Sequence, residues 1–259
     1  MIGVFDSGLG GLAALRPLRA LLPHTDLVYF ADTEALPLGE KTDEEIVGRT
    51  LRALGFFSAM GVRAVLLACG TASSLFPTKC KENFAFSIFD IISPTAAAVK
   101  QMPKDTQTVL LSTEAAARAG VFACALASKN APVLSLACPA LVALAEGKHP
   151  PSDDAVARAL SPVLPLCPAG IVLGCTHFSL LATHIARLLP RARLFDAAAC
   201  GATALAASIR ATDAAKGEAT TRFFVTGEAR RFEAGASRVL GNPVTAKRIS
   251  LPDPALFSP

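Results

Sequence analysis

The sequence predicts an α/β protein built from two similar parallel-sheet domains. Two observations lead to this fold class. Short apolar runs alternate with longer amphipathic stretches along the 259 residues, which is the pattern of parallel strands covered by helices on both faces. A cysteine also ends an apolar run twice, in VLLACGTASSL at 65–75 and VLGCTHFSLL at 172–181, and this repetition suggests a duplication.

The predicted strands are short apolar runs rich in Val, Ile, Leu and Phe. Between them lie amphipathic stretches with helical spacing. The strands are expected at 1–5, 27–30, 64–68, 87–92, 108–112, 132–137, 170–174, 192–196 and 222–226. The helices are expected at 12–22, 43–60, 115–127, 152–162, 180–189 and 197–207.

Helix-start signals support two of these helices. Thr42 is followed three residues later by Glu45, which forms a possible capping box before the stretch that starts at Asp43. Ser152 precedes two aspartates, which suit the first turn of a helix.

The order of the strands suggests how the chain divides into domains. The segments IGVFDSG and TVLLSTEA open the two halves in parallel ways. The run at 222–226 most simply returns to the first half. We therefore expect a discontinuous first domain at 1–95 and 208–259, with a second domain inserted at 96–207.

Composition limits the class of protein. An apolar fraction of 52% indicates a globular chain, and charge, Pro or Gly interrupts every apolar run well before the roughly 20 residues that a membrane-spanning helix needs. No basic segment followed by an apolar segment opens the chain, so we expect a cytoplasmic protein. The net charge of +4 is dispersed, which argues against a nucleic-acid partner.

The seven cysteines are scattered without CxxC pairs, so neither a disulfide framework nor a metal site is predicted. Cys69 and Cys175 differ from the other five, which we expect in the core, because each is placed just past a strand and before a helix. At that position in a parallel sheet a side chain faces the ligand crevice. The amino terminus of a helix also favours a thiolate.

Two thiols that flank one small cavity suit a reaction that removes a proton from one face of a carbon and returns it to the other. Racemisation without a cofactor is such a reaction. Each thiol needs a neighbouring group to adjust its proton, and Asp6 in FDSG and His177 in CTH are the nearest polar candidates. The stretch GLGGLA also fits a dinucleotide-binding fingerprint, but Asp6 would place a carboxylate beside a pyrophosphate. We therefore interpret it as a tight turn that approaches a small anion.

The sequence resembles the glutamate racemases of the aspartate/glutamate racemase superfamily. The shared motifs run almost from end to end: IGVFDSGLGGL, YFADTEALPLGEKT, ACGTASS, ACPALVALAEG, LGCTHFSLL and FFVTGEARRF. The resemblance implies a cofactor-independent enzyme that interconverts L- and D-glutamate for peptidoglycan synthesis. It also implies two pseudosymmetric α/β domains with the active site in the cleft between them, in a homodimer.

The same motifs imply roles for particular residues. Cys69 and Cys175 would be the acid/base pair, and Asp6 and His177 their helpers. Asp32 would order a loop and not react. The residues implied to lie at the substrate are Asp6, Ser7, Gly39, Gly70, Thr71, Glu146, Thr176 and His177.

The sequence departs from the family pattern in three places. Gly70 replaces an asparagine, Leu38 replaces the tyrosine of PYG, and 112–115 read STEA where the pattern has a TxGT-like turn. A lost hydrogen bond to a charged group costs about 1.5 to 3 kcal/mol, although backbone amides at Leu38 and Gly70 could still serve. Three alternatives therefore stay open: another acidic substrate such as aspartate, a non-catalytic amino-acid-binding relative, and, more distantly, a nucleotide-binding oxidoreductase.

Overall fold

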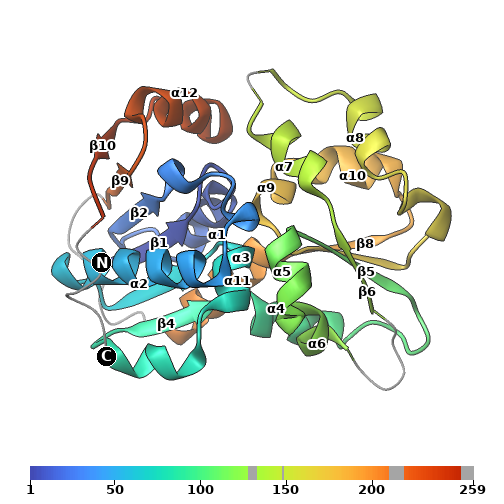
Figure 1. Cartoon of the computed structure of the whole chain (residues 1–259), viewed down its shortest axis with the longest axis horizontal. Helices are drawn as coiled ribbons and strands as arrows, with labels where there is room; N and C mark the ends of the chain where they lie inside the picture. The colour runs from blue at the N-terminus through green and yellow to red at the C-terminus, as the bar shows by residue number, and fades with distance from the viewer. Residues whose placement is uncertain (128–132, 148, 210–218, 252–259) are drawn as a thin grey trace.

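The computed structural model describes residues 1–127, 133–147, 149–209 and 219–251. Its strands form two separate, fully parallel sheets, as the sequence predicts (Figure 1). The six-stranded sheet has the order β10-β9-β2-β1-β3-β4, with β1 (Ile2–Asp6), β2 (Leu27–Ala31), β3 (Ala64–Leu67), β4 (Ser87–Asp90), β9 (Thr221–Val225) and β10 (Ala246–Arg248). The four-stranded sheet has the order β6-β5-β7-β8, with β5 (Thr108–Ser112), β6 (Val133–Ala137), β7 (Gly170–Leu173) and β8 (Arg193–Asp196).

The two sheets share a pattern. The order β2-β1-β3-β4 in the first corresponds to β6-β5-β7-β8 in the second, so β3 and β7, which precede the two cysteines, occupy equivalent positions. The carboxylates that end the equivalent strands β4 and β8 also correspond: Asp90 accepts from the amide of Ile92, and Asp196 accepts from the amide of Ala199. This agreement supports the duplication inferred from the sequence.

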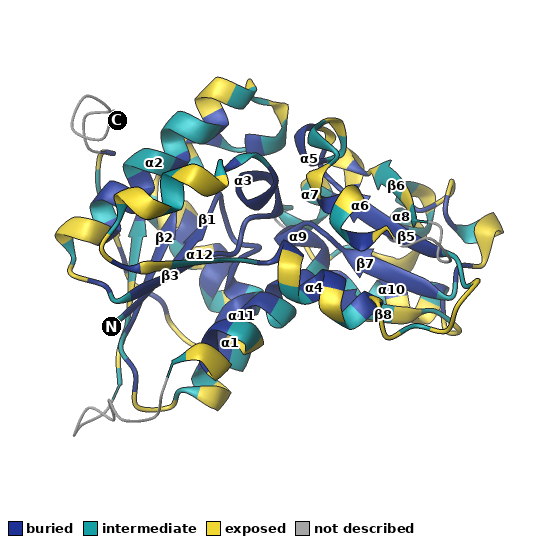
Figure 2. Ribbon diagram, turned by 90° about the horizontal axis from the view of Figure 1, so that it is seen from below, coloured by how far each residue is buried: buried dark blue, intermediate teal, exposed yellow. Residues whose placement is uncertain are grey.

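Helices cover both faces of each sheet, and the inner strands such as β1, β3, β5 and β7 are therefore buried on both sides (Figure 2). One apolar cluster packs α2 (Asp43–Ala59) and α3 (Gly70–Leu75) on the first sheet, and another packs α7 (Pro139–Ala145), α8 (Asp153–Ala159) and α10 (Ala182–Leu188) on the second. A third cluster runs across both sheets and includes α1 (Leu12–Leu21), α4 (Ile92–Val99), α6 (Val121–Leu126), α11 (Ala197–Ser208) and α12 (Ala229–Leu240). The two sheets therefore share a core.

The helix α11 lies at the junction of the two sheets. It packs against α1 and β3 on one side and against α4 and β8 on the other. A Cβ on Gly201 would lie 2.7 Å from Ile91 and 3.1 Å from Leu66, so glycine permits this close packing. The domain boundaries at 95–96 and 207–208 stay a prediction.

Several predicted elements differ in their bounds. The helix expected at 115–127 is divided into α5 (Glu114–Ala119) and α6, because Gly120 adopts a left-handed conformation with φ 67° that ends the first helix. The helix expected at 180–189 begins only at Ala182, after a separate short helix α9 (Thr176–Ser179). The strand expected at 87–92 ends at Asp90, whose carboxylate caps α4.

Thr42 and Ser152 are confirmed as the N-caps of α2 and α8. The hydroxyl of Thr42 accepts a hydrogen bond from the amide of Glu45, and that of Ser152 accepts one from Ala155. The expectation that the other five cysteines lie in the core is wrong for Cys124 and Cys167, which are exposed. Within the described residues, no helix combines the length and apolar character that a bilayer span requires.

Candidate active site

The two cysteines lie at the carboxyl ends of equivalent strands, each at the start of a helix. Cys69 follows β3 and is the N-cap of α3, and Cys175 follows β7 and is the N-cap of α9. Both side chains are buried, with 3% and 5% of their surface exposed. The sequence predicted both positions, because a cysteine that ends a buried parallel strand must project at the edge where ligands bind.

The two cysteine-bearing turns touch each other. A Cβ built on Gly70 would lie only 1.9 Å from the carbonyl oxygen of Gly174 and 3.6 Å from the Cα of Cys175. The sulfurs therefore approach from opposite sheets. Cys69 packs in the apolar cluster of the first sheet and Cys175 in that of the second.

The environment of Cys69 favours the neutral thiol. Burial raises its pKa to about 12, and the nearby Asp6 and Cys175 add to this effect. The thiol donates to the hydroxyl of Ser7 across 3.7 Å. In the enclosed site Cys69 thus holds a proton that it can give to a partner.

The environment of Cys175 is different, because an imidazole and a carboxylate lie in line with it. Its sulfur is 3.6 Å from Nδ1 of His177, and Nε2 of the same ring is 2.6 Å from Oε1 of Glu146. Burial alone would lower the pKa of His177, but the hydrogen bonds to Cys175 and Glu146 raise it well above its usual value. Burial acts to raise the pKa of Glu146, but the hydrogen bond and charge of His177, together with the amide of Leu9 and the charge of Arg231, lower this pKa below its usual value. The three side chains form a path along which a proton can move.

Asp6 connects the first sheet with the turn that carries Cys175. Its Oδ1 accepts from the hydroxyl of Thr176 at 2.9 Å, and its Oδ2 accepts from the amide of Gly8 at 2.9 Å. Burial raises the pKa of this fully enclosed carboxyl. Asp6 therefore lies among the sequence-predicted site residues, with its hydrogen bonds directed to the second cysteine's turn.

Atoms of the second domain pack directly against the glycines of the loop that follows β1. A Cβ on Gly8 would lie 2.7 Å from Oε1 of Glu146, and one on Gly10 would lie 2.5 Å from the amide nitrogen of His177. The amide of Leu9 donates to Glu146 at 3.2 Å. These glycines allow the loop to reach the Cys175 turn, which favours the tight-turn interpretation over a dinucleotide cradle.

Tyr29 is a site-supporting residue that the sequence analysis missed. Its hydroxyl donates to the carbonyl oxygen of Gly8 at 2.7 Å, and the side chain is fully buried. It is the single tyrosine of the chain. A single tyrosine within an apolar strand could have indicated a supporting role, because a buried tyrosine hydroxyl needs a hydrogen-bond partner.

A pair of hydroxyls joins the two domains beside Cys69. Oγ1 of Thr71 lies 2.8 Å from Oγ1 of Thr113, and a Cβ on Gly39 would lie 2.7 Å from the Cβ of Thr113. Thr71 and Gly39 were predicted, whereas Thr113 was noted only as part of a departure from the family pattern. Leu38 is 2% exposed and packs in the same apolar cluster as Ala115. Two of the departures therefore lie within an apolar core.

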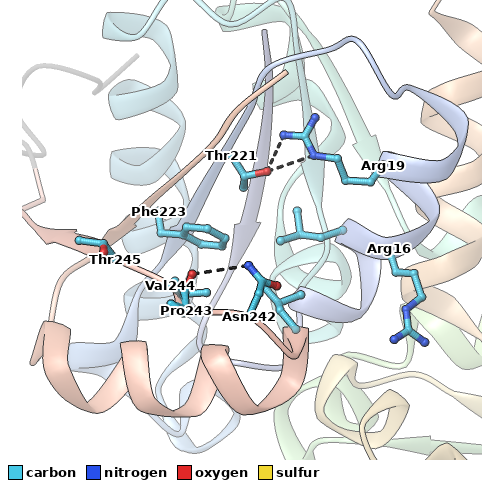
Figure 3. Close-up of a pocket in the computed structure, with 10 residues that line it drawn as sticks. Arg16, Arg19, Thr221, Phe223, Asn242, Pro243, Val244 and Thr245 are labelled. Carbon is cyan, nitrogen blue, oxygen red and sulfur yellow. Dashed lines mark hydrogen bonds between the residues drawn. The ribbon is translucent and has the colours of Figure 1, made fainter. Parts of the chain in front are cut away.

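A surface hollow of about 560 Å³ lies elsewhere, between α1, β9 and the segment before β10. Its lining includes neither cysteine. Arg19 is turned to Thr221, and the guanidinium of Arg16 points away from Phe223 (Figure 3). This hollow presents no acid/base pair. Among the described residues, no three His, Cys, Asp or Glu side chains gather as metal ligands would.

Comparison with known proteins assigns the family. A sequence profile described as Asp/Glu/Hydantoin racemase matches residues 13–205, which is more than half of the chain. The chain belongs to the Asp/Glu/Hydantoin racemase family. The resemblance inferred from the motifs is thereby confirmed.

Individual members of this racemase family match over nearly the whole chain. A glutamate racemase of Desulforudis audaxviator is 34% identical over 94% of this chain and 96% of its own. The crystal structure of glutamate racemase RacE1 from Bacillus anthracis superposes with a TM-score of 0.88 at 26% identity, covering 97% of this chain and 98% of its own. The Escherichia coli glutamate racemase, in complex with L-glutamate and an activator, has a TM-score of 0.77 at 26% identity, with 97% and 98% covered. The predicted fold of two parallel-sheet α/β domains is confirmed.

Proposed function

We propose that this protein is a glutamate racemase that works without a cofactor, with Cys69 and Cys175 as its acid/base pair. The observation that carries the proposal is the meeting of the two cysteine-bearing turns from opposite sheets, with the imidazole of His177 beside one sulfur. The names of the full-length relatives support glutamate as the substrate.

The α-carbon of the substrate would lie between the two sulfurs. The thiolate of Cys175 removes the α-proton, and the electron pair of the broken C–H bond stays on the α-carbon, delocalised into the carboxyl group. The thiol of Cys69 then donates its proton to the opposite face. The sulfurs have exchanged protonation states after one turnover, which prepares the enzyme for the reverse direction.

The surrounding groups have distinct tasks in this mechanism. His177 exchanges a proton with Cys175, and Glu146 holds the imidazole in place through its 2.6 Å contact. Hydroxyl and amide donors hold the substrate's carboxylates, because hydrogen bonds to charged groups are stronger than neutral ones. The donors are Ser7, Gly39, Gly70, Thr71 and Thr176.

We also propose that the enzyme acts in the cytoplasm as a homodimer and supplies D-glutamate for peptidoglycan. These statements follow from the resemblance to glutamate racemases. Sedimentation equilibrium of the purified protein measures its mass directly, and a monomer at all concentrations would contradict the dimer.

Solvent deuterium tests the two-base chemistry. In D2O the wild-type protein should exchange the α-proton of both L- and D-glutamate and remove the optical activity of either. Cys69→Ser and Cys175→Ser should each lose racemisation by about 10³-fold or more, while retaining exchange on opposite enantiomers. Near-normal racemisation by either variant would contradict the mechanism.

A parallel assay with aspartate tests the substrate. Faster turnover of aspartate than of glutamate would move the assignment to another acidic amino acid. Thermal stabilisation by glutamate without any change of optical activity over hours would instead indicate a binding protein that lacks catalysis.

A further inference from the structure

Two sequence motifs have no part in the mechanism above, although the structure joins them. They are the ADTE segment at 31–34 and the VTG segment at 225–227. The first follows β2 and the second follows β9, and these strands are paired neighbours in the first sheet (Figure 1). The segments therefore lie side by side at the edge of the sheet that carries the site.

The hydroxyl of Thr226 links the two segments. It donates to Oδ1 of Asp32 at 2.8 Å and accepts from the amide of Glu34 at 3.0 Å. The amide of Gly227 donates to the hydroxyl of Thr33 at 2.9 Å. Because Thr226 is only 4% exposed, this hydroxyl uses both its donor and its acceptor capacity inside the protein.

Arg49, on α2, completes the arrangement around the same carboxylate. Its Nε is 2.5 Å from Oδ2 of Asp32, and its Nη2 is 2.7 Å from Oδ1. The Asp32 side chain is fully buried and that of Arg49 is 15% exposed. A two-point guanidinium contact of this kind fixes orientation as well as charge. The carboxylate of Asp32 thus accepts three hydrogen bonds from two side chains, Arg49 and Thr226.

The chain that leaves this carboxylate reaches the active site. The amide of Asp32 donates to the carbonyl of Asp6 at 2.9 Å. Further along, Leu36 lies within 3.1 Å of where a Cβ on Gly8 would be, and Gly39 packs on Thr113 of the other domain. The loop 33–40 therefore touches the residues that follow β1 and the residues that follow β5.

We propose that Thr226, Asp32 and Arg49 form a positioning network that holds the loop 33–40 against both cysteine-bearing halves, and thereby sets how tightly the substrate binds. The hydrogen bonds that the structure gives these three side chains go to one another and to the loop and not to a sulfur, so they act through the loop and not on the transferred proton. The inference rests on the proposed racemase function and identifies a part of the same site.

The test replaces the hydroxyl and then restores it. Thr226→Val keeps the shape of the side chain but removes the hydrogen bonds, and we expect KM for glutamate to rise about tenfold with kcat changed by less than about threefold. Thr226→Ser should return KM to within about twofold of wild type. Arg49→Lys keeps the charge without the two-point contact and should raise KM as well.

The matched control is Thr50→Val on the same helix as Arg49. Thr50 is also buried, and its hydroxyl donates to the carbonyl of Ile46 within α2 and not to the loop. This variant should lose stability without a change in KM. If Thr226→Val raises KM no more than Thr50→Val, or if Thr226→Ser behaves like Thr226→Val, the network has only a structural role and the proposal is overturned.

Limited proteolysis gives a readout that does not depend on racemisation. Lys41 directly follows the loop, so Thr226→Val should increase the rate of tryptic cleavage there, whereas Thr50→Val should not. Unchanged cleavage would overturn the positioning role. A wild-type protein that fails to racemise glutamate while Thr226→Val opens the loop would contradict the proposed function and leave the positioning of the loop intact.

Discussion

Replacing Gly70 with alanine tests the contact between the two cysteine-bearing turns. The new Cβ would lie 1.9 Å from the carbonyl oxygen of Gly174, and real Cβ atoms essentially never come closer than 3.0 Å to such a neighbour. The turns must therefore separate by at least 1.1 Å, the difference between these two distances. Neither side can yield by rotating a side chain, because the clash involves backbone on both sides.

The separation acts directly on the chemistry. Gly70 follows Cys69 and Gly174 precedes Cys175, so moving the turns apart also moves the sulfurs away from a substrate held between them. A misplacement of about 1 Å can lower a rate about 10²-fold. We expect kcat/KM of Gly70→Ala to fall by about that factor, and the free energy of unfolding to fall by about 1 to 3 kcal/mol.

The assay follows the optical activity of L-glutamate by circular dichroism, together with urea unfolding. Gly48→Ala is the matched control, because nothing lies within 4 Å of a Cβ at that helical position. This control should keep wild-type activity and gain up to about 1 kcal/mol of stability. A Gly70→Ala protein with wild-type kcat/KM and wild-type stability would refute the conclusion that the close contact of the turns belongs to the active state.

Three further predictions concern single side chains. Glu146→Gln removes the negative charge that helps to raise the pKa of His177. The stability that this charged pair gives the wild-type protein is complete between the usual pKa values of 4.5 for Glu and 6.5 for His. It is lost as the pH falls through the lowered pKa of Glu146 or rises through the raised pKa of His177. Urea unfolding should therefore show the largest difference between Glu146→Gln and wild type near pH 5.5, and a difference that grows toward pH 9 would contradict this. Ser112→Ala should raise the free energy of unfolding by about 1 kcal/mol, because its buried hydroxyl has no hydrogen-bond partner among the residues that the structure describes. Ser73→Ala should lower the free energy of unfolding by a similar amount, because the hydroxyl of Ser73 donates to the carbonyl of Leu67. Thr42→Ala removes a helix cap and should lower the melting temperature at a cost of about 1 kcal/mol, and an unchanged unfolding curve would contradict the cap.

The local elements could be predicted because their signals are local. A buried parallel strand appears as an unbroken apolar run, and all nine predicted strands are present, if sometimes with different ends. The strand β10 escaped prediction because its residues are Ala, Lys and Arg at the edge of the sheet, where little burial is required. The break at Gly120 also escaped, since only the backbone conformation distinguishes a helix-ending glycine from a tolerated one.

The site was predictable where a residue type and a strand end coincided, as for Cys69, Cys175 and Asp6. The hydrogen bonds that join the two domains were harder to predict from the sequence. The bonds from Asp6 to Thr176 and from Leu9 to Glu146 join residues more than a hundred positions apart, and no local pattern encodes them. Glu146 entered only through the resemblance to known racemases, and Thr226 and Arg49 were not expected at the loop at all.

The sequence by itself determined the α/β class, the two repeated strand-to-helix turns and the placement of a thiol on each. Hydrophobic periodicity and helix-capping signals depend on residues that are close together in the chain, so they can be recognised in the sequence alone. The tertiary structure alone decided that the turns meet at Gly70 and Gly174, that His177 lies between Cys175 and Glu146, and that Asp32 is held by Arg49 and Thr226. The meeting of the turns arises because the two sheets share one core, and the other two contacts arise because packing within each half brings residues that are distant in the chain to within hydrogen-bond distance.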